Sequence, residues 1–171
     1  MKKIFWLLDV NYEVRENAPQ IWRWAIDDKA QRDLIVHRGF YPYFYLVLED
    51  GHHSQAVIET ITGRKNEFPS VLQLEPASKH YFGKPIEAVK VYCSSPDVLP
   101  KYAKALSKIE GVKESLEDDM RYAVRYLIDT GASTCGWYEI SVDEIRNTLG
   151  VQVDQVFLAK SPPKGVEKPT I

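Results

Sequence analysis

The order of strand-like and helix-like segments between residues 43 and 117 constrains the fold of this chain more than any other feature. YFYLVLED, at 43–50, is rich in the aromatic and apolar residues that strands favour. HSQAVIETIT, at 53–62, has apolar residues at helical spacing, with Ser54 as its expected cap. The same reasoning predicts strands at 71–77, 87–93 and 112–118 and a helix at 94–109.

The predicted order is therefore β-α-β-β-α-β, the split pattern of ferredoxin-like and RNA-recognition-type folds. A strand at 3–14 and a hairpin formed by 20–26 and 32–38 are expected to extend this core. A further helix is predicted at 119–131, with an acidic start and with Gly131 as its stop. The fold class is α+β, with a mixed or antiparallel sheet.

The pattern weakens after Gly131. CGWYEISVDEIRNTLG is compatible with a strand and a short helix, and VQVDQVFLA with a last strand. SPPKGVEKPT is rich in proline and lysine, as linkers are. We therefore expect a domain over 1–131 and a bridge and linker over 132–171.

Composition excludes several classes of protein. The chain is 44% hydrophobic and 27% charged, with a net charge of −2, so binding to a polyanion requires a local basic patch. Its two cysteines, Cys93 and Cys135, lie far apart and predict neither a disulfide framework nor a zinc site. No apolar run is long enough to cross a bilayer. A cytoplasmic protein without membrane contact is the resulting expectation.

Catalytic motifs are weak. Asp9 follows an apolar strand, as metal-binding carboxylates often do, which leaves a small metal-dependent nuclease as one alternative. The acidic run Glu117, Asp118 and Asp119 is better explained as the start of a helix. The four histidines show no ligand spacing. We expect no metal, no cofactor and no catalytic residue in this chain.

Two groups of basic residues are candidates for contacts with nucleic acid. Lys101, Lys104 and Lys108 fall on one helical face, where they are either solvated or able to follow a phosphate backbone. Arg121 and Arg125 are four residues apart on the helix predicted at 119–131. The apolar face of that helix is expected to comprise Met120, Val124, Leu127 and Ile128. The arginines would then point to solvent or to an anion.

The stretch GFYPYFY, at 39–45, combines tyrosines with a proline. Strand alternation places Tyr41, Tyr43 and Tyr45 in one row, which either stacks on bases or packs in a second aromatic core. Pro42 lacks an N–H group and is expected to end the hydrogen-bonding ladder before Tyr43.

Several stretches together resemble the N-terminal domain of archaeal family B DNA polymerases. They are LDVNY at 8–12, YPYFY at 41–45, ITGR at 61–64, FGKPI at 82–86 with Lys90 and Tyr92 downstream, Pro96 with Pro100, and RYLID.G at 125–131. The resemblance covers about residues 3–131.

This resemblance implies a pocket that captures uracil in the single-stranded template ahead of the polymerase active site, so that synthesis stalls. The positions that match the pocket residues of the family are Tyr12, Pro42, Tyr43, Leu99, Pro100, Met120, Arg121, Tyr122 and Arg125. Leu99 stands where valine is usual, and Met120–Tyr122 replaces an Ile-Pro-Phe pattern.

The resemblance also implies that the exonuclease and polymerase domains, which use Mg²⁺, follow this region in a longer parent, because their motifs are absent here. The expected function is that of a non-catalytic, template-binding domain of a replicative DNA polymerase. The alternatives are a stand-alone RNA-recognition-like module and a scaffold whose pocket has decayed.

Overall fold

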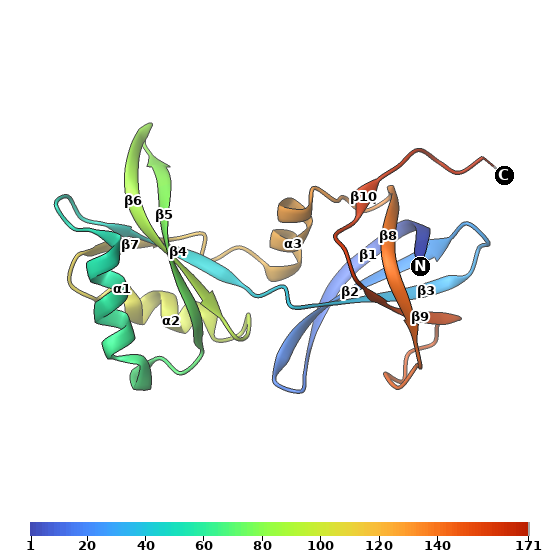
Figure 1. Ribbon diagram of the computed structural model, residues 1–171, viewed down its shortest axis with the longest axis horizontal. Helices are drawn as coiled ribbons and strands as arrows, with labels where there is room; N and C mark the ends of the chain where they lie inside the picture. Colours follow the sequence, from blue (N-terminus) through green and yellow to red (C-terminus); the bar gives the residue numbers. More distant parts are fainter. Residues whose placement is uncertain (171) are drawn as a thin grey trace. The chain divides into compact units, whose positions relative to one another are not determined.

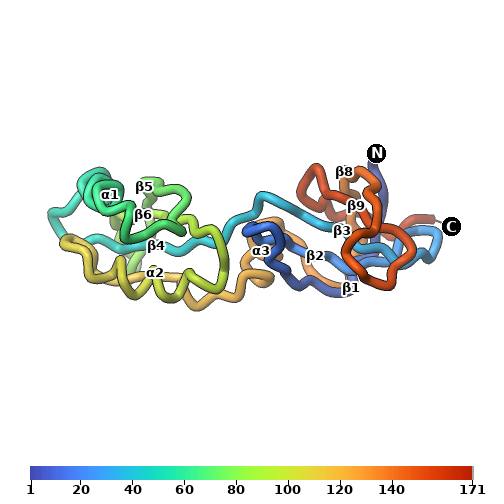
Figure 2. The backbone as a smooth tube through the Cα atoms, turned by 90° about the horizontal axis from the view of Figure 1, so that it is seen from below, coloured from blue at the N-terminus to red at the C-terminus, as the bar shows by residue number. Residues whose placement is uncertain are grey.

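The computed structural model describes residues 1–170, so Ile171, the last residue of the predicted bridge and linker, lies outside them. The chain divides into two compact units. Unit 1 consists of Met1–Phe40 together with the residues from Arg121 onward, and unit 2 consists of Tyr41–Met120. In Figure 2, the N-terminal segment in blue and the last segment in orange and red lie side by side within unit 1. Unit 2 is therefore an insertion in the sequence of unit 1.

Unit 2 has the predicted β-α-β-β-α-β order. Its elements are β4 (Tyr43–Leu48), α1 (Ser54–Gly63), the short 3-10 helix η1 (Lys65–Glu67), β5 (Val71–Tyr81), β6 (Lys84–Cys93), α2 (Leu99–Leu106) and β7 (Val112–Leu116). The four strands form an antiparallel sheet in the order β5-β6-β4-β7. The strands that follow each helix therefore lie at the two edges, and β4 and β6 occupy the centre.

Both helices of unit 2 pack on one face of this sheet, as Figure 1 shows. Phe44 and Leu46 alternate along β4 and meet Ile61 of α1 and Leu106 of α2 in one buried cluster. One local expectation was wrong. Ser54 is the first residue of α1 rather than its cap, and His53 holds the cap position without a side-chain hydrogen bond.

The hairpin of β5 and β6 is longer than the sequence predicted. The strands were predicted at 71–77 and 87–93, but they continue beyond these limits and pair as far as Tyr81 and Lys84. Only Phe82 and Gly83 connect them, with φ angles of 49° and 79°. Two positive φ angles are what a tight turn of type I′ requires. The hairpin extends beyond the other strands of unit 2 (Figure 1).

Unit 1 is built on a barrel. Its elements are β1 (Lys2–Arg15), β2 (Ala18–Asp27), β3 (Arg32–Arg38), α3 (Tyr122–Thr130), β8 (Trp137–Ile145), β9 (Gln155–Ala159) and β10 (Lys164–Gly165). The sheet order is β1-β2-β3-β9-β8-β10, and β1 pairs with β8 as well. That last pairing closes five strands into a ring, in which only β3 and β9 run parallel.

The predicted N-terminal strand and hairpin are confirmed, but they do not extend the sheet of unit 2. They pair instead with β8 and β9, which lie about a hundred residues further along the chain. Five-stranded Greek-key barrels include the OB-fold, whose members often bind oligonucleotides. The core of the barrel contains Phe5, Leu7, Ile35 and Phe157.

The helix α3 ends as predicted and begins later than predicted. Gly131 has φ 67° and closes the helix in the left-handed conformation that glycine accepts at no steric cost. The acidic residues Asp118 and Asp119 do not start it, because the cap position is Arg121 and the first turn contains no acidic residue.

The buried face of α3 also differs from the prediction. Tyr122, Arg125 and Tyr126 are buried, whereas Val124 and Ile128 are 44% and 61% exposed. The rings of Tyr122 and Tyr126 pack with Ile21 of β2 in one buried cluster. They take the place that the prediction gave to the aliphatic side chains of the helix.

After α3, residues 137–145 form β8 as one strand, and the predicted short helix does not follow it. The last predicted strand is confirmed as β9. Within the proline-rich tail, Lys164 and Gly165 add a short strand beside β8. The bridge predicted over 132–171 thus supplies strands to unit 1, and its role between domains stays a prediction.

Candidate nucleic-acid interface

The predicted site residues are divided between the two units. Unit 1 contains Tyr12, Arg121, Tyr122 and Arg125, and unit 2 contains Pro42, Tyr43, Leu99, Pro100 and Met120.

In unit 1, three aromatic rings come together beside the start of α3. The rings of Tyr12 and Tyr122 meet edge to face, with centroids 5.3 Å apart. Phe40 lies against the other side of this group, 5.6 Å from Tyr122, and its carbonyl accepts a hydrogen bond from the Tyr122 hydroxyl. Ring pairs of this kind stabilise by about 0.5–1.5 kcal/mol beyond their buried area. The sequence-predicted partners Tyr12 and Tyr122 are therefore in contact.

The two arginines have different environments. Arg121 is exposed at the cap of α3, and its carbonyl accepts the N–H of Arg125 at 2.9 Å. Arg125 is buried, contrary to the expectation that both arginines point away from the packed face of the helix. Only Arg121 is thus placed to meet a ligand from solvent.

In unit 2, Pro42 does not end the ladder as expected. Its carbonyl accepts the N–H of Cys93 at 2.9 Å, so the pairing with β6 continues one residue before β4 begins. Tyr43 follows and is buried, with the Lys90 ammonium 3.9 Å from its ring centroid. On the other side, the pairing of β4 with β7 begins only at Tyr45.

The tyrosines of β4 belong to the sheet face that the helices leave uncovered. Tyr43, Tyr45 and Tyr92 gather there, with Lys79 and Lys90 lying over the rings. Three carboxylates share this face. Glu75 stands opposite Lys90 in the strand register, and Glu114 stands opposite Val47. Glu117 forms an ion pair with Lys79. The Lys113 ammonium also reaches this face, over the ring of Tyr81. Because the glutamates offset the lysines, the centre of the face offers no strong basic patch to a phosphate backbone, which weakens the RNA-recognition-like alternative.

Leu99 and Pro100 are the first two residues of α2, where proline is tolerated because the N–H is not needed. Leu99 packs into the core of unit 2, whereas Pro100 is exposed. Met120 is half-buried at the end of unit 2.

Lys101, Lys104 and Lys108 are all exposed. The first two lie on α2, which ends at Leu106, and Lys108 lies in the turn that follows. The basic stripe is therefore accessible along its length.

Asp9 makes a local bond. It is exposed at a bulge of β1, and its Oδ1 accepts the N–H of Val10 at 2.8 Å. Within residues 1–170, no group of three or more His, Cys, Asp or Glu side chains is placed to hold a metal ion. None of the helices in this described part is long and apolar enough to cross a membrane.

Sequence reasoning missed a buried charge cluster in unit 1. The Lys3 ammonium lies 3.0 Å from Asp27 and 3.8 Å from Asp33, and both carboxylates are buried. Burial raises the pKa of Asp27, but hydrogen bonds from the N–H groups of Gln31 and Lys29 and from Lys3 outweigh it, so the pKa is lowered. Burial and the charge of Asp27 raise the pKa of Asp33 to about 7.

A second buried group surrounds Tyr126 of α3. Arg23 of β2 lies under its ring, with the guanidinium carbon 5.5 Å from the centroid, and no nitrogen of the guanidinium has a hydrogen-bond partner within residues 1–170. Burial lowers the pKa of Arg23. Burial and the charge of Arg23 lower the pKa of His37 to about 4. An arginine in an otherwise apolar strand was the available signal, and periodicity alone does not reveal its burial.

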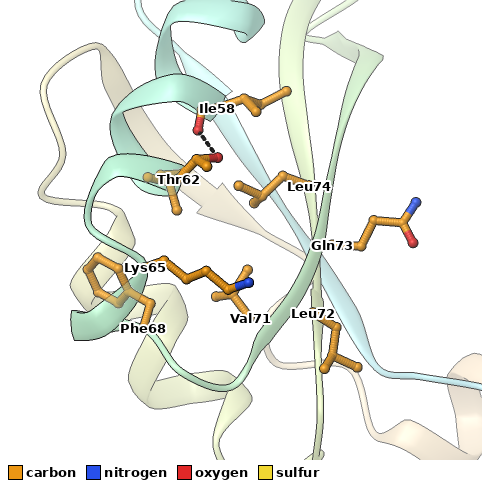
Figure 3. Close-up of a pocket in the computed structure, with 9 residues that line it drawn as sticks. Ile58, Thr62, Lys65, Phe68, Val71, Leu72, Gln73 and Leu74 are labelled. Atoms are coloured by element: carbon orange, nitrogen blue, oxygen red, sulfur yellow. Dashed lines mark hydrogen bonds between the residues drawn. The ribbon is translucent and has the colours of Figure 1, made fainter.

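An apolar hollow of about 190 Å³ lies between α1 and β5 in unit 2 (Figure 3). Ile58 and Leu74 form its walls, Lys65 reaches across it and Leu72 is half-exposed beside it. None of the residues predicted for the site lines this hollow.

The most exposed aromatic ring of the described residues was also missed. Phe82, in the turn of the β5–β6 hairpin, is 91% exposed. The dipeptide Phe-Gly between two strand-like runs was the available signal, since glycine there indicates a tight turn with an exposed neighbour.

Comparison with known proteins adds an independent line of evidence. No protein-family model matches the chain. DNA polymerase 3 of Saccharolobus shibatae is 34% identical over 158 residues, which is 92% of this chain and 20% of that protein. DNA polymerase 2 of Aeropyrum pernix is 32% identical over 154 residues, which is 90% of this chain and 19% of that protein.

A solved structure agrees with these sequences. The family B DNA polymerase from Pyrobaculum calidifontis superposes with a TM-score of 0.80 and 26% identity, covering 97% of this chain and 21% of that one. The chain thus spans about a fifth of the length of the relatives it matches.

Proposed function

Because the chain belongs to the archaeal family B DNA polymerases, in which it corresponds to the N-terminal domain, we propose that it binds single-stranded template DNA and recognises uracil ahead of the active site. The observation that supports the proposal is the match over nine-tenths of the chain to archaeal DNA polymerases. DNA synthesis itself would belong to other domains of a longer protein, which are also the partners proposed for this chain.

The chemistry of the pocket rests on shape. Uracil differs from thymine by one methyl group, and the ring of Tyr43 is proposed to exclude that methyl group, while the backbone near Tyr43 would read the edge of the base. One methyl group in an apolar site changes binding by about 1–3 kcal/mol, which corresponds to roughly ten- to two-hundredfold. Exposed Arg121 would bind a neighbouring phosphate.

The test compares two single strands that differ only in one uracil or thymine. We expect tighter binding to the uracil strand and loss of this preference in Pro100→Gln, because glutamine introduces a longer polar side chain at a position that matches an apolar pocket residue of the family. Leu99→Gln is a poorer choice, since Leu99 supports the core of unit 2. Pro76→Gln, at a second proline of unit 2, is the matched control and keeps the preference.

Two results would contradict the proposal. The first is equal affinity of the wild type for both strands. It would favour the alternative of a scaffold whose pocket has closed, because Leu99 and Met120 depart from the residues usual in the family. Tighter binding to RNA than to DNA of the same sequence would favour the RNA-recognition-like alternative. The proposed location is the cytoplasm, in keeping with two free cysteines, Cys93 and Cys135.

A further inference from the structure

Phe82 is the most exposed large apolar side chain of the described residues, at 91%. It lies at the end of the β5–β6 hairpin, which extends beyond the other strands of unit 2 (Figure 1). Its ring meets the neighbouring ring of Tyr81 edge to face, with the centroids 4.7 Å apart.

This position is unfavourable for folding in two respects. An exposed phenyl ring gains nothing from burial. A φ of 49° is also a left-handed conformation that asparagine and glycine adopt readily and that bulky residues rarely adopt. The turn itself therefore does not explain why phenylalanine stands there, and a ligand for the ring does.

The surroundings of the ring carry positive charge. Lys84 follows the turn directly and is exposed. The Lys113 ammonium of β7 lies 4.8 Å from the ring centroid of Tyr81. The carboxylate of Glu114 accepts a hydrogen bond from the Tyr81 hydroxyl, which raises the pKa of Tyr81. Flat rings beside ammonium groups are the combination that holds bases and phosphates of a single strand.

We propose that the end of this hairpin is a second contact for single-stranded nucleic acid. Phe82 stacks on a base, and Lys84 and Lys113 contact the adjoining phosphates. The surface is separate from the residues assigned to uracil recognition. It shares with the proposed function only the single-stranded ligand, because stacking accepts every base.

The experiment measures binding of the 171-residue chain to a thymidine homopolymer that contains no uracil. Phe82→Asn keeps the left-handed turn and removes the ring. It should weaken binding by roughly five- to 150-fold, the range for one stacked base. Phe82→Trp should bind at least as tightly as the wild type. Leu72→Asn, which removes another exposed apolar side chain of unit 2, is the matched control and should change nothing.

Salt dependence separates the two kinds of contact. Lys84→Ala should lower the log–log slope by roughly 0.7, whereas Phe82→Asn should leave the slope unchanged. Phe82→Leu tests stacking directly and should bind as weakly as Phe82→Asn.

Three results would overturn the inference. The first is binding by Phe82→Asn within about twofold of the wild type, well below the effect of one stacked base. The second is full binding by Phe82→Leu, which would indicate an apolar contact without stacking. The third is self-association of the wild type that Phe82→Asn abolishes, which would make a second copy the occupant. Uracil preference is measured separately, so failure here leaves the proposed function untouched.

Discussion

The hydroxyl of Tyr126 and Nδ1 of His37 lie 2.9 Å apart, so a hydrogen bond joins α3 to the end of β3. Burial and the charge of Arg23 lower the pKa of His37 to about 4. Between this value and the ordinary 6.5, the unfolded chain binds a proton that the folded chain does not. Through His37, stability therefore rises with pH across that window, by roughly 2 kcal/mol after allowance for partial exposure.

Asp33 has the opposite dependence. Its pKa is about 7 when folded and 3.8 in the reference state, so the folded chain holds a proton that the unfolded chain releases. Stability through Asp33 is therefore highest below pH 3.8 and falls as pH rises toward 7.

The two effects should nearly cancel in the wild type, which gives our first prediction. Urea unfolding of Asp33→Asn should show stability rising with pH between about 4 and 6.5, and His37→Gln should show it falling. Ser78→Ala, at an exposed residue that does not titrate, should keep the wild-type profile. Parallel stability profiles for all variants would show that Asp33 and His37 do not make the opposite contributions described here.

The second prediction concerns the buried guanidinium of Arg23. It has no hydrogen-bond acceptor within residues 1–170, so its desolvation is not compensated. Arg23→Met, of similar volume, should be neutral or raise the free energy of unfolding by about 1–4 kcal/mol. Arg32→Met, the control, removes an exposed pair with Asp154 and should change stability little. Strong destabilisation by Arg23→Met would indicate a buried water or ion as the partner of the guanidinium.

The third prediction concerns the exposed lysines of α2 and its following turn. Changing Lys101, Lys104 and Lys108 together to alanine should reduce the salt dependence of single-strand binding, by roughly 0.7 in log–log slope for each phosphate that the variant no longer neutralises. A control removes the same charge from three exposed lysines of unit 1, which are Lys2, Lys29 and Lys164. Equal slopes for the two triple variants would show that the α2 lysines are merely solvated.

The fourth prediction is a change in stability at the hairpin. Phe82→Asn replaces a bulky residue at φ 49° with one that tolerates this conformation. The free energy of unfolding should rise by up to about 1 kcal/mol. Thermal unfolding of Phe82→Asn beside Phe82→Val measures this, since the β-branched side chain should destabilise the same turn. A lower stability in Phe82→Asn than in the wild type would show that the ring supports the fold.

Local periodicity was sufficient to predict unit 2. Each of its strands and helices carries its own pattern within about ten residues, so the β-α-β-β-α-β order followed from the sequence. The barrel of unit 1 could not be predicted in this way. Its closure joins Phe5 with Tyr138, and its parallel pair joins Ile35 with Phe157, pairings that no local pattern encodes.

Side-chain assignments failed where two apolar faces competed. On α3, Val124 and Ile128 have the aliphatic pattern, yet Tyr122 and Tyr126 are buried because their hydroxyls find Phe40 and His37 as partners. Leu99 lies in the core of unit 2, and its assignment to the pocket stays a prediction. Such choices depend on partners that are distant in sequence.

The insertion of unit 2 between β3 and α3 has a consequence for synthesis on the ribosome. All strands of unit 2 have been synthesised once the ribosome has passed Leu116. At that point the barrel still lacks β8 and β9, and β9 is complete only at Ala159. At about 5–20 residues per second, the earlier β1–β3 meander waits seconds for its closing strands while the inserted unit is already able to fold. During that interval the exposed edges of β1 and β3 are open to pairing with other nascent chains. The cellular yield of this protein should therefore depend on translation speed over residues 117–159 more than on the speed over any segment of unit 2.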